Sequence, residues 1–242
     1  PATPFITELK APKGVELYDL TMTVVAANGE TLLSFTHPRP TNPPLPDPMP
    51  RDPKPEDVKS LDELFTIGDR VEKFREVEKA LEYYEEAVRR DPGDVRTNTA
   101  LGLIDLKNGK SEEALARFEK ALERDPAFYK AWYYKGMAQM LLGRCGDAEF
   151  SLNRASYDFT WYAAAQFELA QLTLRQGYAE KALEHIERAI RGNGDNVQAL
   201  AVKAVALNRL GRNEEALKLA GEVQKTDPLD LLSLAAKGLA AR

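Results

Sequence analysis

Small side chains recur at a fixed spacing through most of the chain. From residue 61 onward the sequence falls into five rows of 34 residues without insertion, which begin at Leu61, Val95, Tyr129, Ala163 and Val197. Position 20 of every row is alanine, and position 8 is glycine or alanine. Larger apolar residues fill the space between them. Each row therefore predicts two helices that approach closely at their small residues, because a bulkier side chain there would force the axes apart.

The same rows carry signals that end helices. Position 15 is glycine in the last four rows, and glycine readily takes the left-handed conformation that terminates a helix. Position 32 is proline in three rows, where it ends the second helix, and is replaced by Thr160 and Gly194 in the third and fourth rows. The pattern predicts an all-α array at residues 59–242. Its units are the repeats 61–94, 95–128, 129–162, 163–196 and 197–230, followed by a terminal helix at 231–242.

Two β-rich runs precede the helical rows, at roughly residues 16–27 and 30–36. They flank Asn28-Gly29, a pair that suits a type I′ turn because both central residues must take positive φ. We therefore predict a β-hairpin within residues 1–37. Since a lone hairpin is marginally stable in water, it either packs on the helical part or forms the last ribbon of a β-domain missing from this sequence, and we favour the second.

Prolines separate the hairpin from the helices. Nine of the fifteen prolines lie between residues 38 and 55, and such a stretch lacks the amide donors that helices and central strands need. The pattern predicts an extended, Pro-rich linker at residues 38–58. Two alternatives stay open for it: a solvated spacer, or a segment that docks near the first repeat with Leu45 and Met49 as anchors.

The row length and its small, aromatic and proline positions resemble the tetratricopeptide repeat (TPR) over about residues 61–230. This sequence departs from the family's pattern at a few positions: Asn98 and Gln166 at position 4, Lys135 and Lys203 at position 7, and Ala220 at position 24. The resemblance implies a right-handed superhelical solenoid of about five helix pairs with a concave groove lined by the first helices. It also implies a scaffold that binds a peptide segment or a neighbouring domain in that groove.

The family's geometry implies which side chains line the groove. Its middle would be apolar and aromatic, which suits an adaptable peptide-binding surface, although a tightly wound superhelix would cover some of these side chains itself. The expected groove residues are Phe65, Leu103, Leu106, Tyr133, Tyr134, Met137, Met140, Phe167 and Leu174. Three basic residues would orient acidic or backbone groups at the rim, namely Lys107, Lys130 and Arg175.

The carboxylate clamp of chaperone-adaptor TPRs is not matched. Its five positions hold Phe65, Asp69, Ala100, Lys130 and Tyr134, and of these Lys130 alone agrees with the clamp. An anionic peptide terminus would meet Asp69 without enough compensating donors. A chaperone tail is therefore a disfavoured ligand.

A weaker resemblance covers the whole chain. A β-ribbon, a Pro-rich bridge and an array with AVRRDPGD at 87–94 and DPLD at 227–230 are similar to the C-terminal part of bacterial proteins whose large β-rich N-terminal domain has no assigned function. In that family the domain is similar to sugar-mutarotase β-sandwiches. This implies an alternative role, as the accessory region of a carbohydrate-active or carbohydrate-binding protein. The first residue, Pro1 rather than Met, favours a chain cut from a longer one.

Composition excludes several other functions. The net charge of −5 lacks the basic surplus of a nucleic-acid binder, and no run of about 18 apolar residues would span a membrane. The lone Cys145 excludes an intramolecular disulfide, and His37 and His185, the only histidines, offer little for a triad or a metal site. Phosphate-binding glycine motifs are missing. We therefore expect no enzymatic activity in this chain, no cofactor, no metal, and a cytoplasmic location.

The expected partner is a protein or peptide, with the chain's own Pro-rich linker or a missing β-domain as internal candidates. The end of the sequence suggests another contact. Residues 231–242 are rather apolar for the last helix of a solenoid, which needs a polar outer face. The helix either caps the array through one apolar face, continues into further chain, or mediates self-association.

Overall fold

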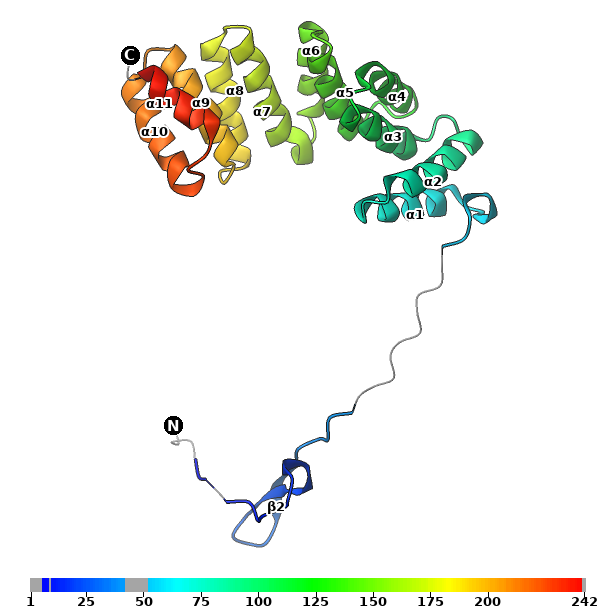
Figure 1. The fold of residues 1–242 in the computed structure, drawn as a ribbon, viewed down its shortest axis with the longest axis vertical. Coiled ribbons are helices and arrows are strands. Elements are labelled where there is room, and N and C mark those ends of the chain that lie inside the picture. The colour runs from blue at the N-terminus through cyan, green and yellow to red at the C-terminus, as the bar shows by residue number, and fades with distance from the viewer. Residues whose placement is uncertain (1–5, 9, 42–51, 241–242) are drawn as a thin grey trace. The chain divides into compact units, whose positions relative to one another are not determined.

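The computed structural model describes residues 6–8, 10–41 and 52–240 (Figure 1). The chain divides into two units, Pro1–Arg51 and Asp52–Arg242. The first unit holds a 3-10 turn at Leu17–Asp19 and one antiparallel hairpin, with β1 at Thr21–Val25 and β2 at Thr31–Thr36. The first strand is shorter than expected because the 3-10 turn occupies the start of the predicted run.

The turn of the hairpin differs from the sequence prediction, and the type I′ assignment was wrong. The N–H of Ala26 donates to the carbonyl of Glu30 at 2.7 Å, and the N–H of Gly29 donates to the carbonyl of Ala26 at 2.9 Å. Three residues therefore form the loop, and Gly29 takes its positive φ of 86° while Asn28 does not. A three-residue loop needs one left-handed residue at its end, which glycine supplies.

The hairpin has one apolar and one polar face. The register pairs Met22 with Phe35 and Val24 with Leu33 on one face, whereas Thr21 and Thr36 share the other, with their hydroxyl oxygens 2.7 Å apart. Met22 and Phe35 are 55% and 53% exposed. Because side chains alternate along a strand, the apolar pairs and the threonine pair lie on opposite faces, and the described residues of this unit leave the apolar face open to solvent.

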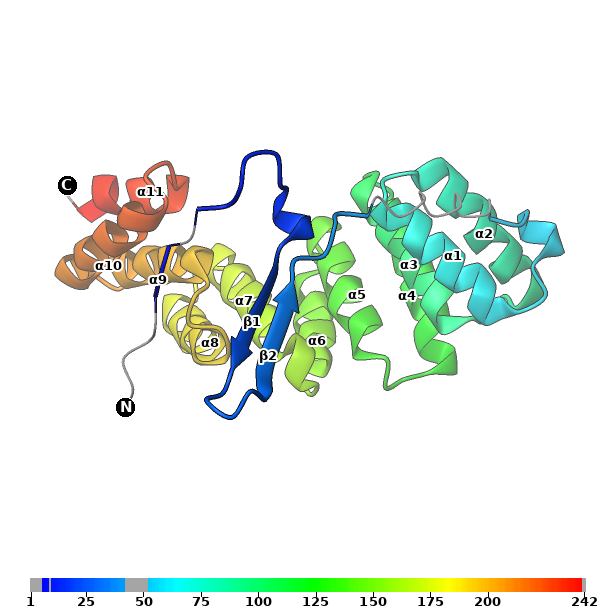
Figure 2. The same ribbon diagram turned by 90° about the horizontal axis from the view of Figure 1, so that it is seen from below.

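The second unit contains eleven α-helices among its described residues, which follow one another as five helix pairs and a terminal helix (Figures 1 and 2). Consecutive helices pack on each other throughout the series, so the unit is an elongated solenoid, as the repeat pattern predicted. The helices are α1 (Leu61–Lys73), α2 (Val77–Arg90), α3 (Val95–Lys107), α4 (Ser111–Arg124), α5 (Tyr129–Leu141), α6 (Cys145–Ala155), α7 (Phe159–Arg175), α8 (Ala179–Gly192), α9 (Val197–Arg209), α10 (Asn213–Thr226) and α11 (Leu231–Ala240).

Position 8 of each first helix packs directly on position 24 of its partner. A Cβ atom on Gly102 would lie 2.6 Å from Cε1 of Phe118, and the same distance separates a Cβ on Gly68 from Cε1 of Tyr84. In the last two pairs position 8 carries alanine, opposite Ile186 in one pair and the small Ala220 in the other. A small residue at position 8 therefore lets the two helices of every pair approach closely.

The two lysines that depart from the repeat pattern at position 7 form ion pairs with the preceding repeat. Lys135 binds Glu119 at 3.1 Å, and Lys203 binds Glu187 at 3.0 Å. Each glutamate stands at position 25 of the preceding row. At both sites, an ion pair between neighbouring repeats thus takes the place of an apolar contact.

The departures at position 4 also have partners. The side-chain amide of Asn98 donates to the carbonyl of Pro92 at 3.0 Å, where the larger Trp132 of the next row donates to Pro126 at 2.9 Å. Gln166 has no such proline and instead forms a 2.8 Å hydrogen bond with Nδ1 of His185. Burial lowers the pKa of His185, and the charge of Arg188 adds to this.

The third repeat lacks its helix-ending proline, which changes the next helix. Helix α7 begins at Phe159, four residues before the row boundary at residue 163. The carboxylate of Asp158 accepts a hydrogen bond from the N–H of Thr160 at 2.9 Å and caps the new start. The additional turn brings Trp161 into the array.

Residues 52–58 lie against the first helix pair. The Tyr83 hydroxyl donates to the carbonyl of Pro53 at 2.8 Å, Arg90 donates to the carbonyl of Val58, and Arg70 forms an ion pair with Asp52. The side chain of Val58 is 3% exposed. This end of the Pro-rich segment therefore belongs to the array, while Leu45 and Met49 lie outside the described residues and their docking stays a prediction.

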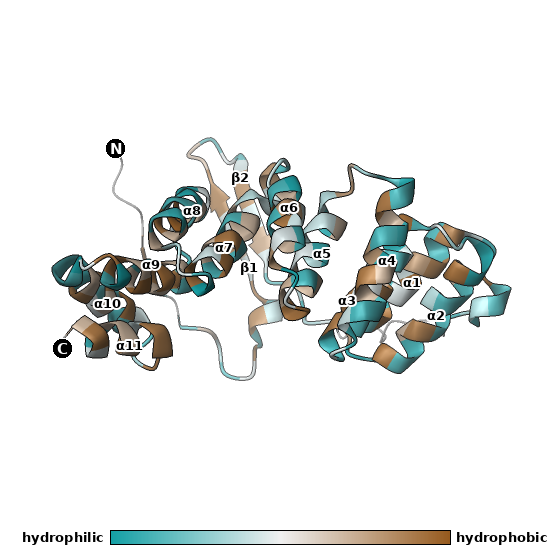
Figure 3. Ribbon diagram, turned by 90° about the horizontal axis from the view of Figure 1, so that it is seen from above, coloured by the Kyte–Doolittle hydropathy of each residue, from teal (hydrophilic) through white to brown (hydrophobic). Residues whose placement is uncertain are grey.

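The array ends on an apolar helix. Helix α11 packs on α9 and α10, and Figure 3 shows α9 and α11 as predominantly hydrophobic. Leu231 and Leu239 nevertheless stay 78% and 53% exposed. Self-association through this surface stays a prediction. Among the described residues, the helices are all too short or too polar to cross a membrane.

The contact between positions 8 and 24 is testable with two glycine substitutions. Gly102→Ala should destabilise the protein by about 1–2 kcal/mol, because the strain of its Cβ against Phe118 exceeds the gain in helix propensity. Gly221→Ala, in helix α10, meets no atom within 4 Å and should stabilise by up to about 1 kcal/mol. Urea unfolding followed by circular dichroism measures both. Equal effects of the two substitutions would contradict the proposed contact.

Candidate functional site

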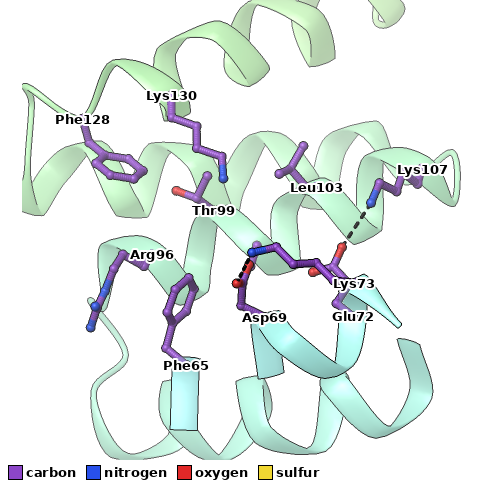
Figure 4. Close-up of a pocket in the computed structure, with 11 residues that line it drawn as sticks. Phe65, Asp69, Glu72, Lys73, Arg96, Thr99, Leu103, Lys107, Phe128 and Lys130 are labelled. Carbon is purple, nitrogen blue, oxygen red and sulfur yellow. Dashed lines mark hydrogen bonds and ion pairs between the residues drawn. The ribbon is translucent and has the colours of Figure 1, made fainter. Parts of the chain in front are cut away.

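A pocket of about 300 Å³ opens between α1, α3 and the start of α5 (Figure 4). It is lined by Phe65, Asp69, Glu72, Lys73, Arg96, Thr99, Ala100, Leu103, Lys107, Phe128 and Lys130. Most of these residues come from the first helices of the first three pairs. The pocket therefore lies in the groove that the repeat pattern predicts.

Aromatic and aliphatic side chains form the walls of this pocket. Phe65 of α1, Phe128, just before α5, and Leu103 of α3 all line it, and Leu103 lies further along the pocket than the two rings (Figure 4). The guanidinium of Arg96 lies 4.9 Å from the centre of the Phe65 ring, which fixes that ring by a cation–π contact. An apolar side chain of a ligand fits such a lining.

The charges of the pocket are balanced except at one lysine. Lys73 binds Asp69 at 2.5 Å, and Lys107 binds Glu72 at 3.1 Å (Figure 4). Lys130 forms no ion pair with any described residue. The available charge in the pocket is therefore positive, which suits an acidic group of a ligand.

A second group of side chains lies where α5 meets α7, and we call Tyr133, Tyr134 and Trp161 the aromatic cluster. The ring centres of Tyr133 and Trp161 are 5.1 Å apart, and those of Tyr133 and Tyr134 are 5.0 Å apart. Trp161 joins this cluster through the additional turn of α7. Aromatic pairs at these separations attract each other beyond the area they bury, so the cluster is a rigid part of the surface.

Glu168 lies beside the aromatic cluster, about two helical turns along α7 from Trp161. Its two carboxylate oxygens accept hydrogen bonds from the Tyr133 hydroxyl at 3.5 Å and from the Gln171 amide at 3.1 Å. Burial raises the pKa of the Glu168 carboxyl, although the hydrogen bond from Tyr133 and the charge of Arg175 act to lower it. Within the described part of the chain, no cation forms an ion pair with Glu168.

The expected groove residues divide into two groups. Phe65, Leu103, Lys107 and Lys130 line the pocket together, and Tyr133 and Tyr134 form most of the aromatic cluster. All nine expected apolar groove residues are half-buried, and several of them also pack into the core between helices, namely Phe65, Leu106, Tyr134, Phe167 and Leu174. Packing between the helices therefore buries part of the surface that we expected to line the groove. Met137 and Met140 are half-buried, and Arg175 is exposed.

The sequence did not point to Phe128 or Trp161, and Glu168 was not among the residues chosen for the site. Phe128 lies in a connection between helices rather than at a groove position of a first helix. Trp161 enters through the early start of α7, and the missing proline at residue 160 is the signal that could have found it. Glu168 stands at a groove position, but the apolar pattern that marks the expected groove residues does not single out a carboxylate.

The two histidines and the cysteine each lie on a different element or loop. His185 is half-buried on α8 against Gln166, and the exposed His37 ring contacts Tyr18 with its centre 5.5 Å away. Cys145 is a half-buried free thiol at the start of α6. Within the described residues, no group of three histidine, cysteine, aspartate or glutamate side chains is placed to hold a metal ion.

Glu168 gives a prediction for stability. Its folded-state pKa is raised, so the ionised form is disfavoured in the fold and works against stability at pH 7. Glu168→Gln keeps the shape and removes the charge, and should stabilise the protein by about 1 kcal/mol at pH 7. The gain should vanish as the pH falls below the ordinary value of 4.5, where the carboxyl is protonated in both states.

Thermal unfolding at several pH values measures this gain. Glu187→Gln is the matched control, because it removes a glutamate that Lys203 already pairs and should give no stabilisation. A destabilised Glu168→Gln variant at pH 7 would contradict the description of Glu168 as a carboxylate whose ionised form is disfavoured in the fold.

Comparisons with known proteins agree with this geometry. A family model described as tetratricopeptide repeat matches residues 99–164, and a model of the N-terminal TPR region of Psidin matches residues 172–240. Among solved structures, the chain is similar to PilF of Pseudomonas aeruginosa, with 20% identity, a TM-score of 0.66, and coverage of 75% of this chain and 83% of that chain.

Two further structures show the same fold. MamA has 24% identity and a TM-score of 0.60, with coverage of 69% of this chain and 92% of that chain. YrrB, described as a TPR protein with an unusual peptide-binding site, has 21% identity and a TM-score of 0.63, with coverage of 76% of this chain and 94% of that chain. The helical unit is therefore a right-handed tetratricopeptide repeat solenoid, and the chain belongs to the TPR proteins.

Proposed function

We propose that this chain is a non-catalytic scaffold whose groove binds an extended segment of a partner protein. The observation that carries the proposal is the pocket of about 300 Å³ between α1, α3 and α5, which combines apolar walls with a lysine that has no ion-pair partner among the described residues. TPR folds typically serve in protein interaction, and the similar protein YrrB has a peptide-binding site.

The lining of the pocket specifies the chemistry of the bound segment. An apolar or aromatic side chain would lie between Phe65, Phe128 and Leu103, and a neighbouring carboxylate would bind Lys130. Asp69 and Glu72 do not repel that carboxylate strongly, because each is neutralised by a lysine. The groove therefore favours an apolar residue next to an aspartate or glutamate.

Selection of random peptides from a display library against the full chain tests this proposal. The enriched peptides should share an apolar residue beside an acidic one. Lys130→Ala should weaken their binding about tenfold in fluorescence polarisation, since a charge-assisted contact contributes about 1.5 kcal/mol or more. Leu103→Ala should weaken binding as well, by shortening the wall of the pocket.

The control is Lys120→Ala, which removes an exposed lysine from the outer helix α4. It should leave peptide binding unchanged, and circular dichroism should show that all three variants are folded. Failure to enrich any peptide, or an equal loss of binding in Lys120→Ala and Lys130→Ala, would contradict the proposal.

The alternative role, as the accessory region of a carbohydrate-active or carbohydrate-binding protein, stays a prediction because no described residue tests it. The cytoplasmic location stays a prediction for the same reason.

A further inference from the structure

The aromatic cluster and Glu168 combine aromatic rings with a carboxylate that has no ion-pair partner among the described residues, whereas both carboxylates of the pocket bind a lysine. Glu168 is the carboxylate of the groove whose hydrogen bonds come from neutral donors, the Tyr133 hydroxyl and the Gln171 amide. A carboxylate accepts about four hydrogen bonds, so each oxygen still has capacity for another donor. Asp69 and Glu72 contrast with it, because each already binds a lysine.

Among the described residues no basic side chain forms an ion pair with Glu168, and the charge of Arg175 acts on it only from a distance. On the next first helix, α9, the corresponding groove positions are the buried Ala201 and Val202. Arg209 of that helix donates to the carbonyl of Leu174 at 2.9 Å and is thereby occupied. The exposed Arg175 lies two turns further along α7 and forms no ion pair with Glu168.

The rings beside Glu168 favour a cation as well. Trp161 and Tyr133 lie with their centres 5.1 Å apart and their planes inclined by 31°, and the Tyr133 hydroxyl joins this pair of rings to the carboxylate. The face of an aromatic ring attracts a cation, and tryptophan does so most strongly. A guanidinium matches this combination better than an ammonium, because its plane stacks on a ring while its N–H groups bind a carboxylate in pairs.

We propose that Glu168 and the aromatic cluster form a subsite for an arginine side chain of the bound segment. The guanidinium stacks on the cluster and donates hydrogen bonds to the carboxylate of Glu168. This inference rests on the proposed function, since it assigns a second position of the same groove. An apolar and acidic position near Lys130 and a basic position near Glu168 would fix the direction in which the segment lies.

N-acetyl-arginine amide is a suitable probe, with the uncharged N-acetyl-citrulline amide as its matched control. The chain has two tryptophans, so its NMR spectrum has two indole N–H signals, which a Trp161→Phe variant assigns. Trp132 donates its indole N–H to Pro126 and serves as an internal reference. The arginine probe should shift the Trp161 signal saturably while leaving the Trp132 signal in place.

The proposal requires two differences in that titration. The citrulline probe should bind at least about fivefold more weakly than the arginine probe, and Glu168→Gln should weaken arginine binding by a similar factor, whereas Glu187→Gln should not. No shift at Trp161, equal binding of the two probes, or unchanged arginine binding by Glu168→Gln would each overturn the arginine subsite.

The peptide selection separates this inference from the proposed function. Peptides selected on the wild-type chain should contain an arginine that is no longer enriched on Glu168→Gln. Peptides that depend on Lys130 but not on Glu168 would overturn the subsite and leave the proposed function in place. If binding of the arginine probe depends on Glu168 but no peptide depends on Lys130, the result would support the subsite and overturn the proposed function.

Discussion

The contact between position 8 of each first helix and position 24 of its partner determines the distance between the two helices. Glycine faces Tyr84, Phe118 or Leu152 in the first three pairs, and a Cβ on these glycines would lie only 2.6–2.7 Å from the facing side chain. This leaves no room for a larger residue, so the pairs stay closely spaced along the array. The groove depends on this spacing, because it is formed by side chains of successive first helices.

The repeated geometry brings residues far apart in sequence to one surface. Phe65, Leu103 and Lys130 come from three successive repeats, yet they line a single pocket. Each acidic residue of the pocket forms an ion pair with a lysine. The electrostatic field that a ligand meets in the pocket therefore comes mainly from Lys130 and from more distant charges. The array thus provides a rigid support, and the side chains at a few positions give the groove its chemical character.

The sequence predicted the helix pairs well because period and small residues are local signals that recur five times. The groove residues were harder to predict, since exposure depends on how tightly successive pairs pack, and Leu106 and Tyr134 pack partly into the core. The early start of α7 and the loop position of Phe128 also depend on tertiary packing. The prediction of the hairpin turn was wrong for a different reason. Asn28-Gly29 suits two loop lengths, and the hydrogen bond between Ala26 and Glu30 selects the longer one.

The polar residues that depart from the repeat show why Glu168 is unusual. Lys135 and Lys203 each bind a glutamate of the preceding repeat, and Gln166 binds His185. At these sites the array satisfies a polar substitution with a partner, which limits its cost to stability. Glu168 has neutral donors but no ion-pair partner among the described residues, and burial disfavours its ionised form in the fold. A charge of this kind is stabilised when a ligand brings the opposite charge, which is why its place in the groove points to recognition rather than to packing.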